Sequence, residues 1–63
     1  MNKDDITPKQ KVVVANDCYG FKAGTQTVIE GNKPTFGKSG KTVMVQQGVG
    51  TGLFVDLDNL KTA

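Results

Sequence analysis

Two β-branched, apolar runs joined by a glycine-rich turn constrain the fold of this chain more than any other feature. Residues 41–47 (KTVMVQQ) and 53–56 (LFVD) flank the turn GVGTG at 48–52. Glycine reaches the backbone conformations that a tight turn needs, and flanking runs of this composition are typical of β-strands. The segment therefore predicts a β-hairpin. The residues that follow, 56–60 (DLDNL), have a spacing that favours one tight 3-10 turn, and a short last strand is expected at 61–62.

The preceding part of the chain also has the composition of strands separated by loops. Residues 10–15 and 25–30 are rich in Val, Ile and Thr, and we expect a strand in each. Residues 16–24 and 31–40 combine Gly with Asn, Asp, Ser or Pro, which is typical of loops. No segment repeats apolar residues at helical spacing over two turns, so the sequence predicts an all-β fold. The expected core consists of Val12, Val14, Val28, Val43, Val45, Phe54, Val55, Leu57 and Leu60.

A length of 63 residues allows one domain. Residues 1–9 are mostly polar, and we expect a flexible lead-in from which Ile6 alone can attach to the domain at 10–63. The single cysteine, Cys18, cannot form an internal disulfide, which fits a reducing compartment. The sequence has no secretion signal and no apolar run of membrane-spanning length, so we expect a cytoplasmic protein with no membrane contact.

The charge balance argues against a dedicated reader of DNA sequence. Eight lysines and six acidic residues give a net charge of +2, and the chain contains no arginine. Arginine supplies the planar pair of donors that reads guanine edges and binds phosphates. Lysine still contacts a phosphate backbone, so nonspecific binding of nucleic acid stays open.

The order of strands, loops and turns resembles the SH3-like small β-barrel superfamily. Residues 22–30 (KAGTQTVIE) are similar to the turn and strand of those barrels, and residues 55–60 (VDLDNL) to their closing apolar pair. The resemblance implies a small five-stranded SH3-like barrel with a C-terminal 3-10 turn. The chain departs from SH3 domains that bind proline motifs, because it has no tryptophan. The remaining relatives are stand-alone bacterial, phage and ribosome-associated barrels, which act as accessory subunits, nucleic-acid-touching modules or inhibitors.

Three segments imitate catalytic or metal-binding motifs without completing them. Residues 37–42 (GKSGKT) end like a phosphate-binding loop, but the first glycine of that motif is missing and a strand follows. Asp56 and Asp58, with Glu30, are better explained as caps of exposed backbone N–H groups. Cys18 has no histidine to activate it. We therefore expect no enzymatic activity, no cofactor and no metal.

Binding is the one activity that the sequence favours over background. The two long loops carry aromatic and lysine side chains, and in SH3-like barrels these loops flank one groove. Such a surface suits a protein interface or the stacking of bases; alternatively, both phenylalanines fold back to plug the barrel ends. The candidate binding residues are Tyr19, Phe21, Lys22, Lys33, Phe36, Lys38 and Lys41.

Three hypotheses for the activity follow from these residues. The first is a non-enzymatic protein-binding module, an accessory or inhibitory factor that acts on a larger cytoplasmic partner through the two loops. The second is nonspecific nucleic-acid binding through Lys33, Lys38 and Lys41, because residues 31–41 hold these three lysines and no acidic residue. The third is a homo-oligomer that forms a larger site at its interface.

Overall fold

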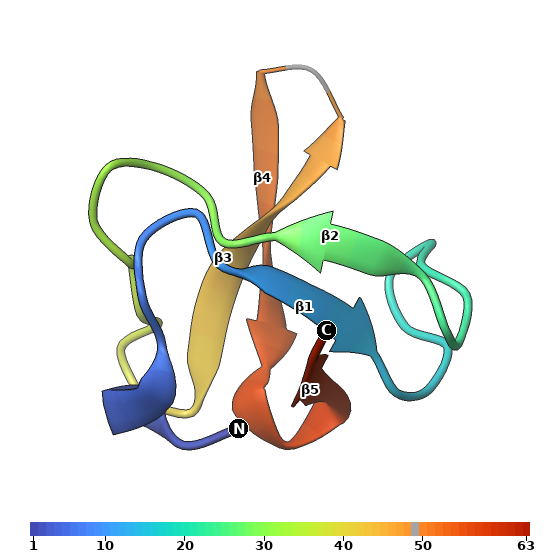
Figure 1. Ribbon diagram of the computed structural model, residues 1–63, viewed down its shortest axis with the longest axis horizontal. Helices are drawn as coiled ribbons and strands as arrows, with labels where there is room; N and C mark the ends of the chain where they lie inside the picture. The colour runs from blue at the N-terminus through green and yellow to red at the C-terminus, as the bar shows by residue number, and fades with distance from the viewer. Residues whose placement is uncertain (49) are drawn as a thin grey trace.

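Five short antiparallel strands form two sheets (Figure 1). The computed structural model describes residues 1–48 and 50–63. One sheet has the order β2–β1–β5, and the other is the hairpin of β3 and β4. The strands are β1 (Lys11–Val14), β2 (Gln26–Val28), β3 (Thr42–Gly48), β4 (Thr51–Asp56) and β5 (Leu60–Thr62).

The elements occur in the expected order, but their bounds differ: β2 is shorter than the strand expected at 25–30, and β3 and β4 extend into the turn expected at 48–52. The all-β fold, the five strands and the 3-10 turn between the last two strands, η2 (Leu57–Asn59), are confirmed. The expected turn at 48–52 includes Val49, which lies outside the described residues; the neighbouring Gly50 has a φ of 76°, a conformation that favours glycine. A second one-turn 3-10 helix, η1 (Lys3–Asp5), was not expected.

The two sheets meet along a short seam and do not close into a barrel. Ile29 forms an isolated bridge with Val45, and the amide of Glu30 donates to the carbonyl of Met44 at 3.0 Å. Among the described residues, β4 pairs only with β3, and β5 pairs only with β1. Closure would require hydrogen bonds between β4 and β5. These strands are joined along the chain by η2, but they belong to different sheets. The described residues therefore form an open pair of sheets rather than the closed barrel expected from the resemblance.

Ten apolar side chains from both sheets form the core. Two of the expected core residues are wrong. Val28 is half-buried, and Phe54 is 37% exposed on the outer side of the hairpin. Each has a buried apolar neighbour, and successive side chains of a strand point to opposite faces. The observed core consists of Ile6, Val12, Val14, Phe21, Ile29, Val43, Val45, Val55, Leu57 and Leu60.

The first residues of the chain contact the C-terminal part of the fold. Ile6 lies in the core, and the backbone nitrogen of Met1 donates to the carbonyls of Leu57 at 2.6 Å and Leu60 at 3.2 Å. These contacts place residues 1–6 against η2 and the start of β5. The flexibility expected of residues 1–9 stays a prediction, but the attachment through Ile6 is present.

Candidate functional site

The first long loop ends in a tight two-residue turn that exposes a tyrosine. The amide of Phe21 donates to the carbonyl of Cys18 at 2.7 Å, and the amide of Cys18 donates back to the carbonyl of Phe21 at 3.0 Å. Tyr19 and Gly20 occupy the tip with φ values of 46° and 87°. Such tips favour Gly, Asn and Asp, because positive φ crowds any larger side chain. Tyr19 nevertheless occupies this position, and its side chain is 64% exposed.

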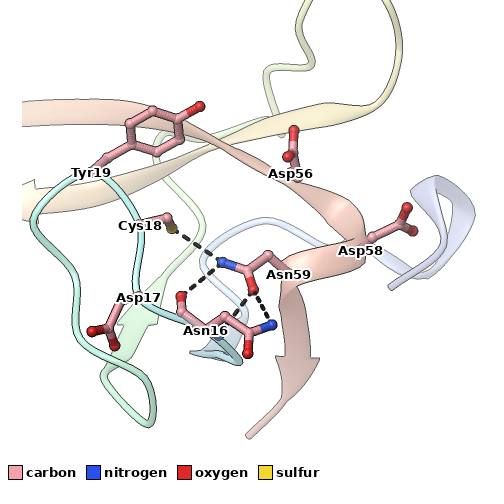
Figure 2. A pocket seen from close by; sticks show the side chains of 7 residues that line it. All are labelled: Asn16, Asp17, Cys18, Tyr19, Asp56, Asp58 and Asn59. Atoms are coloured by element: carbon pink, nitrogen blue, oxygen red, sulfur yellow. Dashed lines mark hydrogen bonds between the residues drawn. The ribbon is translucent and has the colours of Figure 1, made fainter.

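One asparagine from η2 holds the base of this loop (Figure 2). The Oδ1 atom of Asn59 accepts a bond from the amide of Asn16 at 2.9 Å, and its Nδ2 donates to the carbonyl of Asn16 at 3.0 Å. The same Nδ2 donates to Sγ of Cys18 at 3.1 Å. At the other end, Nε2 of Gln47 donates to the carbonyl of Tyr19 at 2.9 Å. The position of the tyrosine is therefore determined by bonds to η2 and to β3.

A hollow of about 360 Å³ lies between the first loop and the end of β4. Figure 2 shows the Tyr19 hydroxyl pointing towards the side of the hollow that holds Asp56. Three of the lining residues are acidic, and no lysine lines it. Opposite charges attract across such a surface, so the hollow favours a cationic group. Its lining residues are Asn16, Asp17, Cys18, Tyr19, Asp56, Asp58 and Asn59.

The second long loop has the opposite charge. Its lysines Lys33, Lys38 and Lys41 are exposed, whereas Phe36 is half-buried and forms a bridge with Val43. The Nζ atom of Lys3 lies 5.0 Å from the centre of the Phe36 ring, within the range of a cation–π contact. The N-terminal segment thus adds a fourth lysine to the basic side of the molecule.

The structure separates the candidate residues of the two loops. In Figure 1, residues 16–24 lie on the right of the hairpin and residues 31–41 on the left, so they do not form one compact face. The outer side of β4 lies between them. Asp56 of this strand lines the hollow with Tyr19, and a Cβ placed on Gly37 would lie 4.0 Å from Cδ1 of Phe54.

The two phenylalanines of the loops differ in exposure from the third, Phe54. Phe21 is a core residue at 9% exposure, so it is corrected from a surface candidate to a structural one; the adjacent Lys22 is exposed. Phe36 packs against the core from the edge. Sequence reasoning missed the exposure of Phe54, because residues 53–55 are all apolar and their alternation does not show which of them faces the core.

The described part of the chain contains neither a candidate metal site nor a candidate membrane-spanning helix. Within residues 1–48 and 50–63, no three His, Cys, Asp or Glu side chains come together in a way that could hold a metal ion. In that same part of the chain, no helix has the length and apolar character needed to cross a membrane. Comparison of the chain with family models, with curated proteins and with solved structures found no match.

Proposed function

We propose that this chain is a small non-enzymatic protein-binding module, an accessory or inhibitory factor for a larger cytoplasmic protein. The observation that carries the proposal is Tyr19, a 64% exposed ring at a backbone position with a φ of 46°. Tyrosine is among the residues that contribute most to protein interfaces. Strained backbone positions persist where the surrounding structure supports them, and they cluster at binding sites.

The charge around Tyr19 indicates the chemistry of the partner. Asp17, Asp56 and Asp58 line the same hollow, and all three are exposed. A partner segment with a lysine or arginine would place its cation among these carboxylates and its apolar stem on the tyrosine ring. We therefore propose a basic extended segment of the partner protein as the occupant. The outer side of β4, with Phe54, would continue the contact towards the second loop.

The order of the elements supports a relationship with stand-alone SH3-like proteins as part of the same proposal. The strands β1 to β4, the 3-10 turn η2 and the last strand β5 follow one another along the chain as in that superfamily. The chain would be an open member, because β4 and β5 do not pair among the described residues. Function in that superfamily depends on the site rather than on the fold, so the site carries the argument.

An array of extended peptides tests this proposal. Each peptide is printed in three versions that carry lysine, alanine or glutamate at its centre. We expect the labelled protein to bind lysine versions at least tenfold better than glutamate versions. Tyr19→Asn should weaken binding of every version, because it removes the ring while asparagine tolerates positive φ.

Lys38→Ala is the matched control on the basic side of the molecule, and it should bind the array as the unmodified protein does. Equal binding of all three peptide versions would contradict the charge argument. Undiminished binding of the lysine versions by Tyr19→Asn would contradict the role of the ring.

Nucleic-acid binding is the second candidate, and the lysine pattern of the second loop favours it. Lys33, Lys38 and Lys41 are exposed on a loop without an acidic residue, and Lys3 lies against Phe36 beside them. Contacts to phosphates would give an affinity that falls steeply with salt. A mobility shift with single-stranded oligothymidylate at low salt tests this candidate. The absence of a shift at micromolar protein would exclude it.

A further inference from the structure

Within residues 1–48 and 50–63, no strand pairs with the outer edge of β4. On the neighbouring strand, the amide of Met44 donates to Thr35 and its carbonyl accepts from Glu30, so these groups point away from β4. Met44 is directly opposite Phe54. In an antiparallel ladder, the backbone N–H and C=O groups of two opposite residues either bond to each other or all point away from the partner strand. The N–H and C=O groups of Phe54 therefore point to the free edge.

The same alternation places two further residues on this edge. Gly52 and Asp56 are two positions before and after Phe54, and they pair with Gln46 and Thr42 in the same register. The carbonyl of Thr42 accepts from the amide of Gly37, so it also points away from β4. Gly52, Phe54 and Asp56 thus point three N–H groups to this edge, and Gly52 and Phe54 add two carbonyls. The carbonyl of Asp56 is used differently, because Asp56 is the N-cap residue of η2 and its C=O accepts the first bond of that turn.

This edge lacks the features that usually protect free strands. Natural edge strands carry lysine or proline, or are interrupted by a bulge, and these features prevent pairing with another chain. β4 has the sequence TGLFVD, with neither lysine nor proline. The register shift of the hairpin lies in β3, between Gln46 and Gly48. Phe54 adds an exposed apolar ring at the centre of the edge.

We propose that a second copy of this chain pairs with this edge, β4 against β4, around a two-fold axis at Phe54. Antiparallel pairing in this register puts each Phe54 opposite its equivalent, and each Asp56 opposite Gly52 of the other copy. Aromatic pairs stabilise such positions, and each carboxylate faces a residue without a side chain. A shift of the axis to Asp56 would put two like charges opposite each other. The charge pattern therefore excludes the register centred on Asp56, and the pairing of the two aromatic rings favours the register centred on Phe54.

The resulting dimer contains a continuous sheet with the strand order β3–β4–β4–β3. The exposed rings of both Phe54 residues lie together on its outer side, near the half-buried Met44 of each copy. The dimer pairs through backbone groups of β4, but it shares Asp56 and Phe54 with the surface proposed for the partner, so the two contacts would compete for this strand. The dimer corresponds to the third hypothesis from the sequence, with a defined surface.

Charge replacement at the two-fold axis tests the dimer. Unmodified protein should sediment at twice the chain mass of 6.7 kDa at high micromolar concentration. Phe54→Lys and Phe54→Glu should each sediment at the mass of one chain, because like charges meet at the axis. An equimolar mixture of the two variants should return to twice the chain mass, because a lysine then faces a glutamate.

Hydrogen exchange and a matched control identify the edge. The amides of Gly52, Phe54 and Asp56 should be protected in the dimer and should exchange freely in Phe54→Lys. Gln26→Lys, an exposed substitution on β2 at the other sheet, should leave the dimer unchanged. A single-chain mass for the unmodified protein at millimolar concentration would overturn the proposal. Failure of the mixed variants to associate, or unprotected β4 amides in a dimer, would overturn it equally.

Discussion

Replacement of Tyr19 by asparagine should stabilise the fold while removing the proposed binding ring. Tyr19 has a φ of 46°, and a non-glycine residue in the left-handed region costs about 1–2 kcal/mol. Asparagine reduces this cost because its short side chain tolerates the region. The tyrosine side chain is 64% exposed, so its removal sacrifices little packing. We expect the free energy of unfolding to rise by about 0.5–1 kcal/mol.

Urea denaturation followed by circular dichroism measures this change. For a domain of this size, 1 kcal/mol corresponds to a shift of about 1 M in the urea midpoint and about 4–8 °C in Tm. Lys9 is a matched control, because it also has a positive φ, 57°, in a different turn. Lys9→Asn should give a similar gain without affecting peptide binding. A loss of stability in Tyr19→Asn would refute the argument that the backbone is strained at this position.

Three further substitutions test the packing and the loop anchor. Ile29→Ala removes a fully buried side chain at the seam between the sheets, and a loss of about 3 kcal/mol should leave the chain largely unfolded by circular dichroism. Asn59→Ala should cost about 1–3 kcal/mol and should accelerate amide exchange at Asn16, whose carbonyl and amide lose their partner. Ile6→Ala should lower the urea stability by about 2 kcal/mol, and unchanged stability would show that residues 1–9 do not contribute to the core.

The hairpin and the order of the strands were predictable because they depend on local composition, whereas the strand boundaries were less so: β2 is shorter and β4 begins earlier than expected. The face of the sheet to which a side chain points was predictable only where apolar and polar residues alternate. In residues 41–45 the two valines alternate with other residues, and both are buried as expected. Residues 28–29 and 53–55 contain consecutive apolar residues, so alternation alone does not distinguish the buried face. In residues 28–29, the bridge between Ile29 and Val45 determines that Ile29 faces the core, and it joins residues that are not neighbours in the sequence.

The candidate site was predicted in its residue types but not in its arrangement. Tyr19 was identified because an aromatic residue in a Gly- and Asn-containing loop is conspicuous. Its position beside Asp56 depends on the long-range bonds of Asn59, and no local pattern indicates them. The separation of the two loops depends on how far the sheets open. The composition of the loops does not indicate how far apart the two sheets hold them. The sequence therefore could not establish that both loops form one binding face.

The bonds of Asn59 have a consequence for anyone who would use the tyrosine loop outside this protein. They join Asn16 of this loop to a residue 43 positions away in the sequence. A synthetic peptide that copies residues 16–24 lacks this anchor, so it would sample many shapes and should lose most of the affinity proposed for the loop. Transplantation to another scaffold would succeed only if the host supplied an equivalent carboxamide beneath the loop.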